Sequence, residues 1–205
     1  MKFLRKFNEH TSYEAELNVG GGVDISLPNV SYCEDVKDVH YTQYNLVRFY
    51  VGEITEPQTV MISTDLITFE NVQVSEGNKW YSYLLPKGKG LSGINGTVNK
   101  VVVKADIKTT NNTIIPSSTV EASFKGSNTS NLTSTTIMFK DCSSLTSLDL
   151  SGWNMSNVTN MEQMFSGCSK LNTIKMIGCK QPTIDKIKAQ LTEDGIINNV
   201  NIITK

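Results

Sequence analysis

MFKDCSSLTSLDLSG, residues 138–152, returns as MFSGCSKLNTIKMIG at residues 164–178, 26 residues further along the chain. The apolar positions, the cysteine and the final glycine recur in register between the two copies. The same period extends one step backward and one step forward with fewer matching positions. A fixed period of this size predicts that successive copies stack and bury one shared apolar face. We predict that this repeated core consists of Phe124, Met138, Phe139, Cys142, Leu145, Leu148, Leu150, Met164, Phe165, Cys168, Leu171, Ile174, Met176, Val200 and Ile202.

An L-x-x-L-x-L core within a period of roughly 20 to 29 residues is typical of a leucine-rich-repeat solenoid. Parallel strands stacked about 4.8 Å apart would form one side of such a repeat. We expect these short strands at residues 122–124, 148–150, 174–176 and 200–202. We also expect a short helix at residues 157–165, and a longer final helix that begins near Pro182 and ends before Gly195.

Cys142 and Cys168 occupy the same position in successive copies, which would place their Cα atoms about one strand spacing, ~5 Å, apart. A disulfide between them is geometrically conceivable. We favour the alternative, a ladder of small buried thiols that stay reduced. Cys33 and Cys179 have no paired spacing, and the chain has only 2 histidines, so we expect neither a metal site nor a cofactor.

The chain before the repeats divides into two segments. The first, residues 1–45, holds a glycine run that stops any helix and is too short to build a core of its own. The second, residues 46–118, is rich in β-branched and aromatic residues separated by turn signals, which predicts a small antiparallel β domain. We expect the first segment to dock on another surface through Phe3, Phe7, Tyr13 and Tyr32.

These patterns together predict a mixed α/β chain of three parts. They are a short N-terminal arm at residues 1–45, a small antiparallel β domain at residues 46–118, and a solenoid of about four 26-residue rungs with a C-terminal cap at residues 119–205.

The composition excludes several classes of protein. The chain has 205 residues, of which 39% are hydrophobic, and a formal net charge of −1, with the basic residues scattered along it. We therefore expect no nucleic-acid partner and no membrane span. The start MKFLRKF resembles the basic opening of a signal peptide, but the polar NEHT follows where an apolar core should stand. We expect the protein to be made and kept in a cytoplasm.

The sequence predicts binding rather than catalysis. It holds no His-x-x-x-His, Gly-x-Ser-x-Gly or comparable signature of a catalytic site, so we expect no enzymatic activity. Trp80, Tyr81 and Tyr83 leave two interpretations open. They could stack on a sugar, or they could pack in the core of the β domain, and we favour the core.

The repeats resemble a known family. The run from Met138 to Asn154, continuing through Ser156 to Met161, resembles the BspA-like leucine-rich-repeat family. The distinctive parts are M-F-x-x-C at residues 138–142 and W-N-x-S-N-V-T-N-M at residues 153–161. Members of this family are described as adhesins, so the resemblance implies a binding role.

The beginning of the chain carries a second resemblance. Residues 7–15 and 27–41 are similar to the opening of virion proteins from Bacteroides phages, including crAss-like phages. This similarity implies a non-enzymatic virion structural protein, a capsid- or tail-attached fibre or decoration component such as a head fibre, assembled in the host cytoplasm. It implies other capsid or tail proteins, further copies of the chain (a trimer by analogy) and a host-surface glycan or protein as partners. The alternative is a bacterial BspA-like adhesin at the cell surface.

Overall fold

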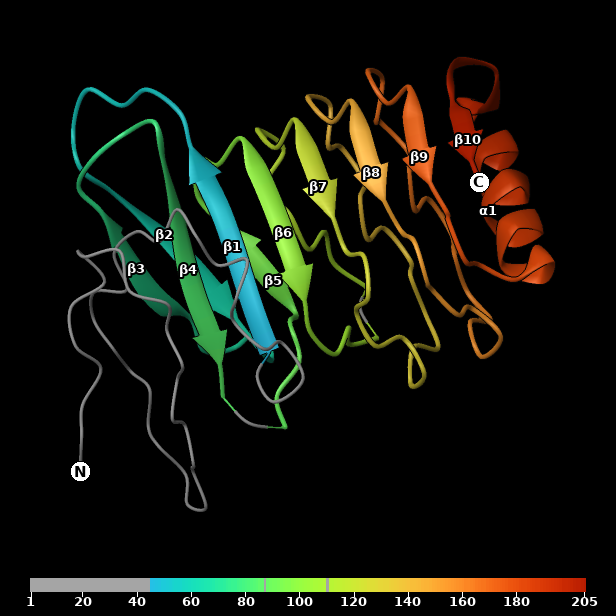
Figure 1. Cartoon of the computed structure of the whole chain (residues 1–205), viewed down its shortest axis with the longest axis horizontal. Helices are drawn as coiled ribbons and strands as arrows, with labels where there is room; N and C mark the ends of the chain where they lie inside the picture. Colours follow the sequence, from blue (N-terminus) through green and yellow to red (C-terminus); the bar gives the residue numbers. More distant parts are fainter. Residues whose placement is uncertain (1–44, 87, 110) are drawn as a thin grey trace.

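Figure 1 shows the computed structural model, which describes residues 45–86, 88–109 and 111–205. The proposed attachment residues Phe3, Phe7, Tyr13 and Tyr32 lie outside these described residues. The elements in chain order are β1 (Asn45–Val51), β2 (Gln58–Ser63), β3 (Glu70–Val74), β4 (Lys79–Leu85), β5 (Gly93–Asn95), β6 (Lys100–Lys104), β7 (Glu121–Ser123), β8 (Ser147–Asp149), β9 (Thr173–Lys175), α1 (Gln181–Glu193), the 3₁₀ helix η2 (Ile197–Asn199) and β10 (Asn201–Ile203).

The strands of the described residues form two sheets. The larger has seven strands in the order β10-β9-β8-β7-β6-β1-β4, and the smaller has three in the order β3-β2-β5. Strand β1 is antiparallel to both β4 and β6, whereas β6, β7, β8, β9 and β10 are parallel to one another. The larger sheet is therefore mixed, and it runs along most of the length of the described molecule (Figure 1).

Alternation of apolar and polar residues explains the antiparallel part. In β1, the buried Val47, Phe49 and Val51 alternate with half-exposed residues, and β2 buries Val60 and Ile62. Successive side chains of a strand point to opposite faces, so each of these strands has one largely buried face, and in β1 Leu46 is buried on the opposite face as well. The buried residues of both sheets belong to one hydrophobic cluster, which continues without a break into the parallel part.

In the parallel part of the larger sheet, each of the short strands β7 to β10 contributes one apolar side chain to the core. Ala122, Leu148, Ile174 and Ile202 are paired in register along β7, β8, β9 and β10. The first three are at most 5% exposed, and Ile202 at the end of the sheet is half-buried. Burial of one such leucine or isoleucine stabilises the fold by about 1.5–3 kcal/mol. Strands β7, β8 and β9 each begin one residue before the predicted strand, and β10 begins one residue after it.

Aromatic rings pack against one another in the core, and one pair, Phe139 and Phe165, stacks at the 26-residue period. The ring centroids of Phe124 and Phe139 lie 5.6 Å apart, and those of Phe139 and Phe165 lie 5.9 Å apart. Trp153 packs edge-on against Phe124 and donates its indole N–H to the Phe124 carbonyl at 3.2 Å. The hydrogen bond removes the cost of burying the indole nitrogen, so a tryptophan fits a position that is 1% exposed.

The fold class predicted from the sequence is wrong. The described residues are mostly β, with a single α-helix, and form one seven-stranded mixed sheet and one three-stranded antiparallel sheet instead of a mixed α/β chain that ends in a solenoid. The larger sheet also crosses the boundary placed at residue 118, because β6 pairs with β7. The functional division of the chain into three parts stays a prediction.

The short helix predicted at residues 157–165 does not form. Single turns take its place: the Val158 N–H donates to the Met155 carbonyl at 3.1 Å, and the Met164 N–H donates to the Met161 carbonyl at 3.0 Å. Gln163 has a φ of 56°, and a left-handed residue interrupts a right-handed helix. An apolar spacing of three residues suits both a turn and a helix, so the pattern alone did not distinguish them.

The final helix is confirmed. Helix α1 begins at Gln181 with Pro182 in its first turn, and Gly195 follows its end with a φ of 76°. Its buried side chains include Ile184, Ile187 and Leu191, which extend the core beneath the end of the sheet. Among the described residues, no helix is both long enough and apolar enough to cross a membrane.

Polar side chains of α1 bind backbone groups of the neighbouring turn. The Thr183 hydroxyl accepts the Met155 N–H at 3.3 Å. The Lys186 ammonium donates to the Met155 carbonyl at 2.9 Å and to the Val158 carbonyl at 2.7 Å. These contacts satisfy the Met155 N–H and the Val158 carbonyl, and they add a second hydrogen bond to the Met155 carbonyl.

A carboxylate ends one ladder of backbone hydrogen bonds. The Phe139 N–H donates to the Met164 carbonyl of the next copy at 2.9 Å. The equivalent Phe165 N–H instead donates to the Asp194 carboxylate at 2.8 Å, just past the end of α1. Together with Lys186 and Thr183, Asp194 closes this end of the repeated segment with side chains instead of another backbone.

Candidate binding surface

One face of the larger sheet carries a row of side chains from all seven strands. Strand pairing places one residue of each strand in this row, in the order of the sheet. The row consists of Trp80, Tyr50, Lys100, Glu121, Ser147, Thr173 and Asn201. We call this face of the larger sheet the outer sheet face. None of these seven side chains belongs to the buried core.

The position of the row follows from the alternation along each strand. Neighbours of the row residues, such as Phe49, Tyr81 and Val101, point into the core and are at most 2% exposed. The row residues therefore point to the opposite face. Seven strands at about 4.8 Å spacing make a surface about 29 Å long, with side chains at regular intervals. A surface of this length suits an extended partner better than a small molecule, because small-molecule sites are concave.

The β4 end of the outer sheet face is aromatic. The guanidinium carbon of Arg48 lies 4.9 Å from the centre of the Trp80 ring, a cation–π contact. The ring centroids of Tyr50 and Trp80 lie 5.6 Å apart at an interplanar angle of 60°. The Tyr50 hydroxyl donates to the Asn78 side-chain oxygen at 3.4 Å, a long hydrogen bond. These contacts hold two amphipathic rings in place, and such rings can contact apolar and polar parts of a partner together.

The remainder of the face is polar. Lys100 and Glu121 form an ion pair at 3.3 Å across β6 and β7, with side chains 42% and 53% exposed. Because both side chains are well exposed, the pair contributes little to stability. Ser147 and Thr173 follow on β8 and β9 and present hydroxyl groups that can donate and accept hydrogen bonds. The outer sheet face therefore combines rings, charges and hydroxyls, which is the chemistry of a binding surface.

The structure separates the three aromatic residues considered as a sugar platform. Tyr81 and Tyr83 are 2% and 5% exposed, so core packing is confirmed for both, while Trp80 lies on the outer sheet face. The ring of Tyr81 stacks on Phe49 with centroids 5.7 Å apart. A sugar platform made of all three residues is wrong, because consecutive strand residues alternate between faces.

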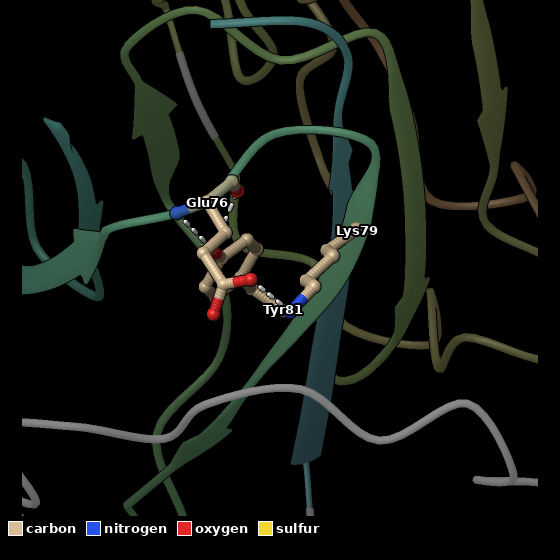
Figure 2. Close-up of polar contacts among 3 residues, drawn as sticks. All are labelled: Glu76, Lys79 and Tyr81. Carbon is tan, nitrogen blue, oxygen red and sulfur yellow. Dashed lines mark hydrogen bonds and ion pairs between the residues drawn. The ribbon is translucent and has the colours of Figure 1, made fainter. Parts of the chain in front are cut away.

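Figure 2 shows how the Tyr81 hydroxyl is satisfied inside the turn that precedes β4. It donates to the Glu76 carbonyl at 2.7 Å and accepts the Glu76 N–H at 3.1 Å. The Glu76 carboxylate forms an ion pair with Lys79. The buried ring therefore meets no unpaired polar group, and the turn is tied to the strand that carries Trp80.

Cys142 and Cys168 are free thiols in the core. The Cys142 thiol donates to the Ile115 carbonyl at 3.7 Å, and the Cys168 thiol donates to the Phe139 carbonyl at 3.0 Å. Burial raises the pKa of both thiols, that of Cys168 to about 12, because the low-polarity surroundings disfavour the thiolate. In the structure both cysteines are therefore buried free thiols, and no disulfide joins them. Within the described ranges, no group of three or more His, Cys, Asp and Glu side chains could hold a metal ion.

The residues of the predicted repeated core belong to one hydrophobic cluster or pack against it. All are at most 1% exposed except Val200 and Ile202, which are half-buried at the end of the sheet. Sequence reasoning missed Arg48, Tyr50 and Lys100 as members of one surface. Their polar-apolar alternation within each strand was visible, but no local pattern shows which strands become neighbours.

Comparison with known proteins finds a family model over the middle of the chain. Residues 93–183, from β5 to the first turn of α1, match a family described as Mycoplasma protein of unknown function, DUF285. No curated protein and no solved structure matches the chain. The matched stretch is less than half of the 205 residues, and it makes this part of the chain similar to that family.

Proposed function

We propose that this chain is a non-enzymatic structural protein of a bacteriophage virion that binds a partner macromolecule on the outer sheet face. The observation that carries the proposal is the row of side chains from Trp80 to Asn201, which crosses the whole larger sheet. The partner is a neighbouring capsid or tail protein or a host-surface glycan or protein. The similarity of the N-terminal segment to phage virion proteins supports a location on the particle.

The character of the outer sheet face supports a macromolecular partner. Trp80 and Tyr50 are rigid rings, and tyrosine and tryptophan are enriched where one protein binds another. Lys100 and Glu121 are exposed charges that a partner can pair with, and such pairs contribute to specificity and association rate more than to affinity. A catalytic role has no support from sequence motifs, so binding is the simpler account.

A bacterial cell-surface adhesin remains the second candidate. The observation in its favour is the family match, whose description names Mycoplasma and not a phage. The resemblance to BspA-like repeats is compatible with both candidates, since the same repeat could bind a partner from a particle or from a cell surface.

Mass spectrometry separates the two candidates. Density-purified phage particles and the washed envelope fraction of the same culture are analysed in parallel, and the copy number per particle is measured. Stoichiometric recovery with particles is the expected result. Recovery in the envelope fraction alone would overturn the virion proposal and support the adhesin.

A second experiment tests the outer sheet face itself. Trp80→Ser removes the largest ring of the face, and Glu162→Gln serves as a control because Glu162 lies in an exposed turn outside the strands. Both variants are produced during infection, and their incorporation into particles and the adsorption of those particles to host cells are measured. We expect Trp80→Ser to reduce one of the two by about tenfold or more, the size typical of the loss of an aromatic residue on which binding depends, and Glu162→Gln to change neither. Unchanged incorporation and adsorption of Trp80→Ser would exclude this face as the binding surface.

A further inference from the structure

Three large apolar side chains are exposed among the described residues, and they lie in two places. Ile67 and Phe69 are 84% and 41% exposed in the connection between β2 and β3. Ile177 is 47% exposed in the turn between β9 and α1. Figure 1 places β2 and β3 toward one end of the molecule and β9 and α1 at the other. We call these two places the β2–β3 loop (residues 64–69) and the β9–α1 turn (residues 176–180).

The β2–β3 loop is held in one conformation by its own hydrogen bonds. The Asp65 carboxylate accepts the N–H groups of Ile67 and Thr68, each at 2.8 Å, and the Thr68 hydroxyl. These donors, with the Thr68 N–H first, lower the pKa of Asp65 to about 2. The Ser63 hydroxyl oxygen accepts the Leu66 N–H at 2.7 Å. The apolar tip is therefore ordered before any partner arrives, which lowers the entropy cost of binding.

The two places carry opposite charges. Residues 52–78 contain five acidic residues and no lysine or arginine, a charge of −5, and the pairing of Glu76 with Lys79 leaves a surplus of −4. Residues 163–184 contain three lysines and no acidic residue, a charge of +3. Asp65 and Glu70 flank the apolar tip of the loop, and Lys175 and Lys180 flank Ile177, all four with exposed side chains.

We propose that copies of this chain associate head to tail, with the β2–β3 loop of one copy docked on the β9–α1 turn of the next. Ile67 and Phe69 would pack against Ile177, and the acidic rim of the loop would meet the basic rim of the turn. Opposite charges around an apolar centre are the usual arrangement of a protein–protein contact. The contact needs neither a virion nor a host, so it stands or falls independently of the proposed function.

The two surfaces differ, so each copy keeps one unused loop and one unused turn after the first contact. Such a contact closes into a ring if the rotation between copies permits, and otherwise extends into a chain. The apolar part is small, far below the roughly 800 Å² per partner of a standard interface. We therefore expect weak association, with a dissociation constant in the range of about 10 µM to 1 mM.

Two variants, each lacking one of the two surfaces, test whether the loop of one copy contacts the turn of the next. Ile67→Ser removes the loop surface, and Ile177→Ser removes the turn surface; both side chains are exposed, so folding should be preserved. Analytical ultracentrifugation of the full chain from about 1 µM to 1 mM should show association of the wild type and none of either variant alone. An equimolar mixture of the two variants should form a dimer that does not grow, because one loop and one turn remain intact.

Charge reversal provides an independent readout. Glu70→Lys should raise the dissociation constant about fivefold, the size typical of one exposed ion pair, and Lys175→Glu in the same chain should restore it. Lys125→Glu is the matched control, because Lys125 is an exposed lysine in the turn after β7 and belongs to neither surface. Added salt should weaken the wild-type association.

Three results would overturn the proposal. A wild-type chain that stays monomeric at about 1 mM has no such contact. A mixture of the Ile67→Ser and Ile177→Ser variants that fails to dimerise, when the wild type associates, would show that the loop of one copy does not dock on the turn of the next, and dimers of one variant alone would show that like surfaces meet. Association that survives both substitutions in one chain would place the contact elsewhere. If the wild type stays monomeric, the apolar loop would instead be a contact for a different protein.

Discussion

Lys186→Met should destabilise the protein by about 2 kcal/mol, although this lysine lies on a helix at the edge of the molecule. The ammonium donates to the Val158 carbonyl at 2.7 Å and to the Met155 carbonyl at 2.9 Å. A hydrogen bond from a charged group contributes about 1.5–3 kcal/mol. The Met155 carbonyl also accepts the Val158 N–H at 3.1 Å, so its loss is smaller. Lys186 is half-buried, so water can replace part of the hydrogen bonding that the Val158 carbonyl loses. The expected loss of stability is therefore less than the sum of two full hydrogen bonds.

Urea unfolding followed by circular dichroism measures this effect. Methionine keeps the apolar stem of lysine, so the substitution removes the ammonium and little of the packing. Lys188→Met is the matched control, because Lys188 lies on the same helix with an exposed side chain and loses the same charge. We expect the control to stay within about 0.5 kcal/mol of wild type. Equal midpoint shifts for the two variants, at unchanged m-value, would show that charge alone matters and refute the capping role of Lys186.

Leu148→Ala should cost about 2–5 kcal/mol in urea unfolding, because Leu148 is 0% exposed at the centre of the parallel strands. The pKa of Asp65 is lowered from 3.8 to about 2, so its stabilising contribution is fully present above about pH 4 and is lost as the pH falls through about 2. The amide NMR shifts of the β2–β3 loop should titrate with a midpoint near pH 2. In a Cys33→Ser background, Cys179 should react with a thiol reagent before Cys142 and Cys168, because Cys179 is only half-buried.

Each of these predictions has an outcome that contradicts it. A change of a few tenths of a kcal/mol in Leu148→Ala would mean that the residue is not buried in this register. Loop amides that titrate near pH 4 would show an ordinary Asp65 carboxyl and a loop without its hydrogen bonds. Rapid labelling of Cys142 or Cys168 in the folded protein, with the same rate as Cys179, would place the two thiols at the surface.

Much of the parallel part could be predicted from the sequence. The 26-residue period located β7, β8 and β9 within one residue, and it identified Leu148 and Ile174 as stacked neighbours. Proline and glycine at its two ends also located α1. These features are encoded in short stretches, since an apolar side chain at a fixed interval buries one face whatever lies further along the chain.

The fold class and the candidate surface could not be predicted in this way. The turn around Gln163 replaced an expected helix because the backbone groups of that copy bond to the preceding copy, as in the Thr159 N–H donating to the Thr133 carbonyl at 2.9 Å. Tertiary contacts between copies thus overrode a local pattern that suits a helix equally well. Residues 1–44, where the attachment site was predicted, lie outside the described residues.

The sequence by itself determined which residues are buried in the repeats and where the last helix lies, because periodicity and helix-end residues act over a few neighbours. Only the tertiary structure decided that β6 pairs with β7, so that antiparallel and parallel strands share one sheet. It also decided that Tyr50 lies between Trp80 and Lys100. Strand register joins residues that are 30 to 50 positions apart, and the free energy that selects one register comes from the whole buried face.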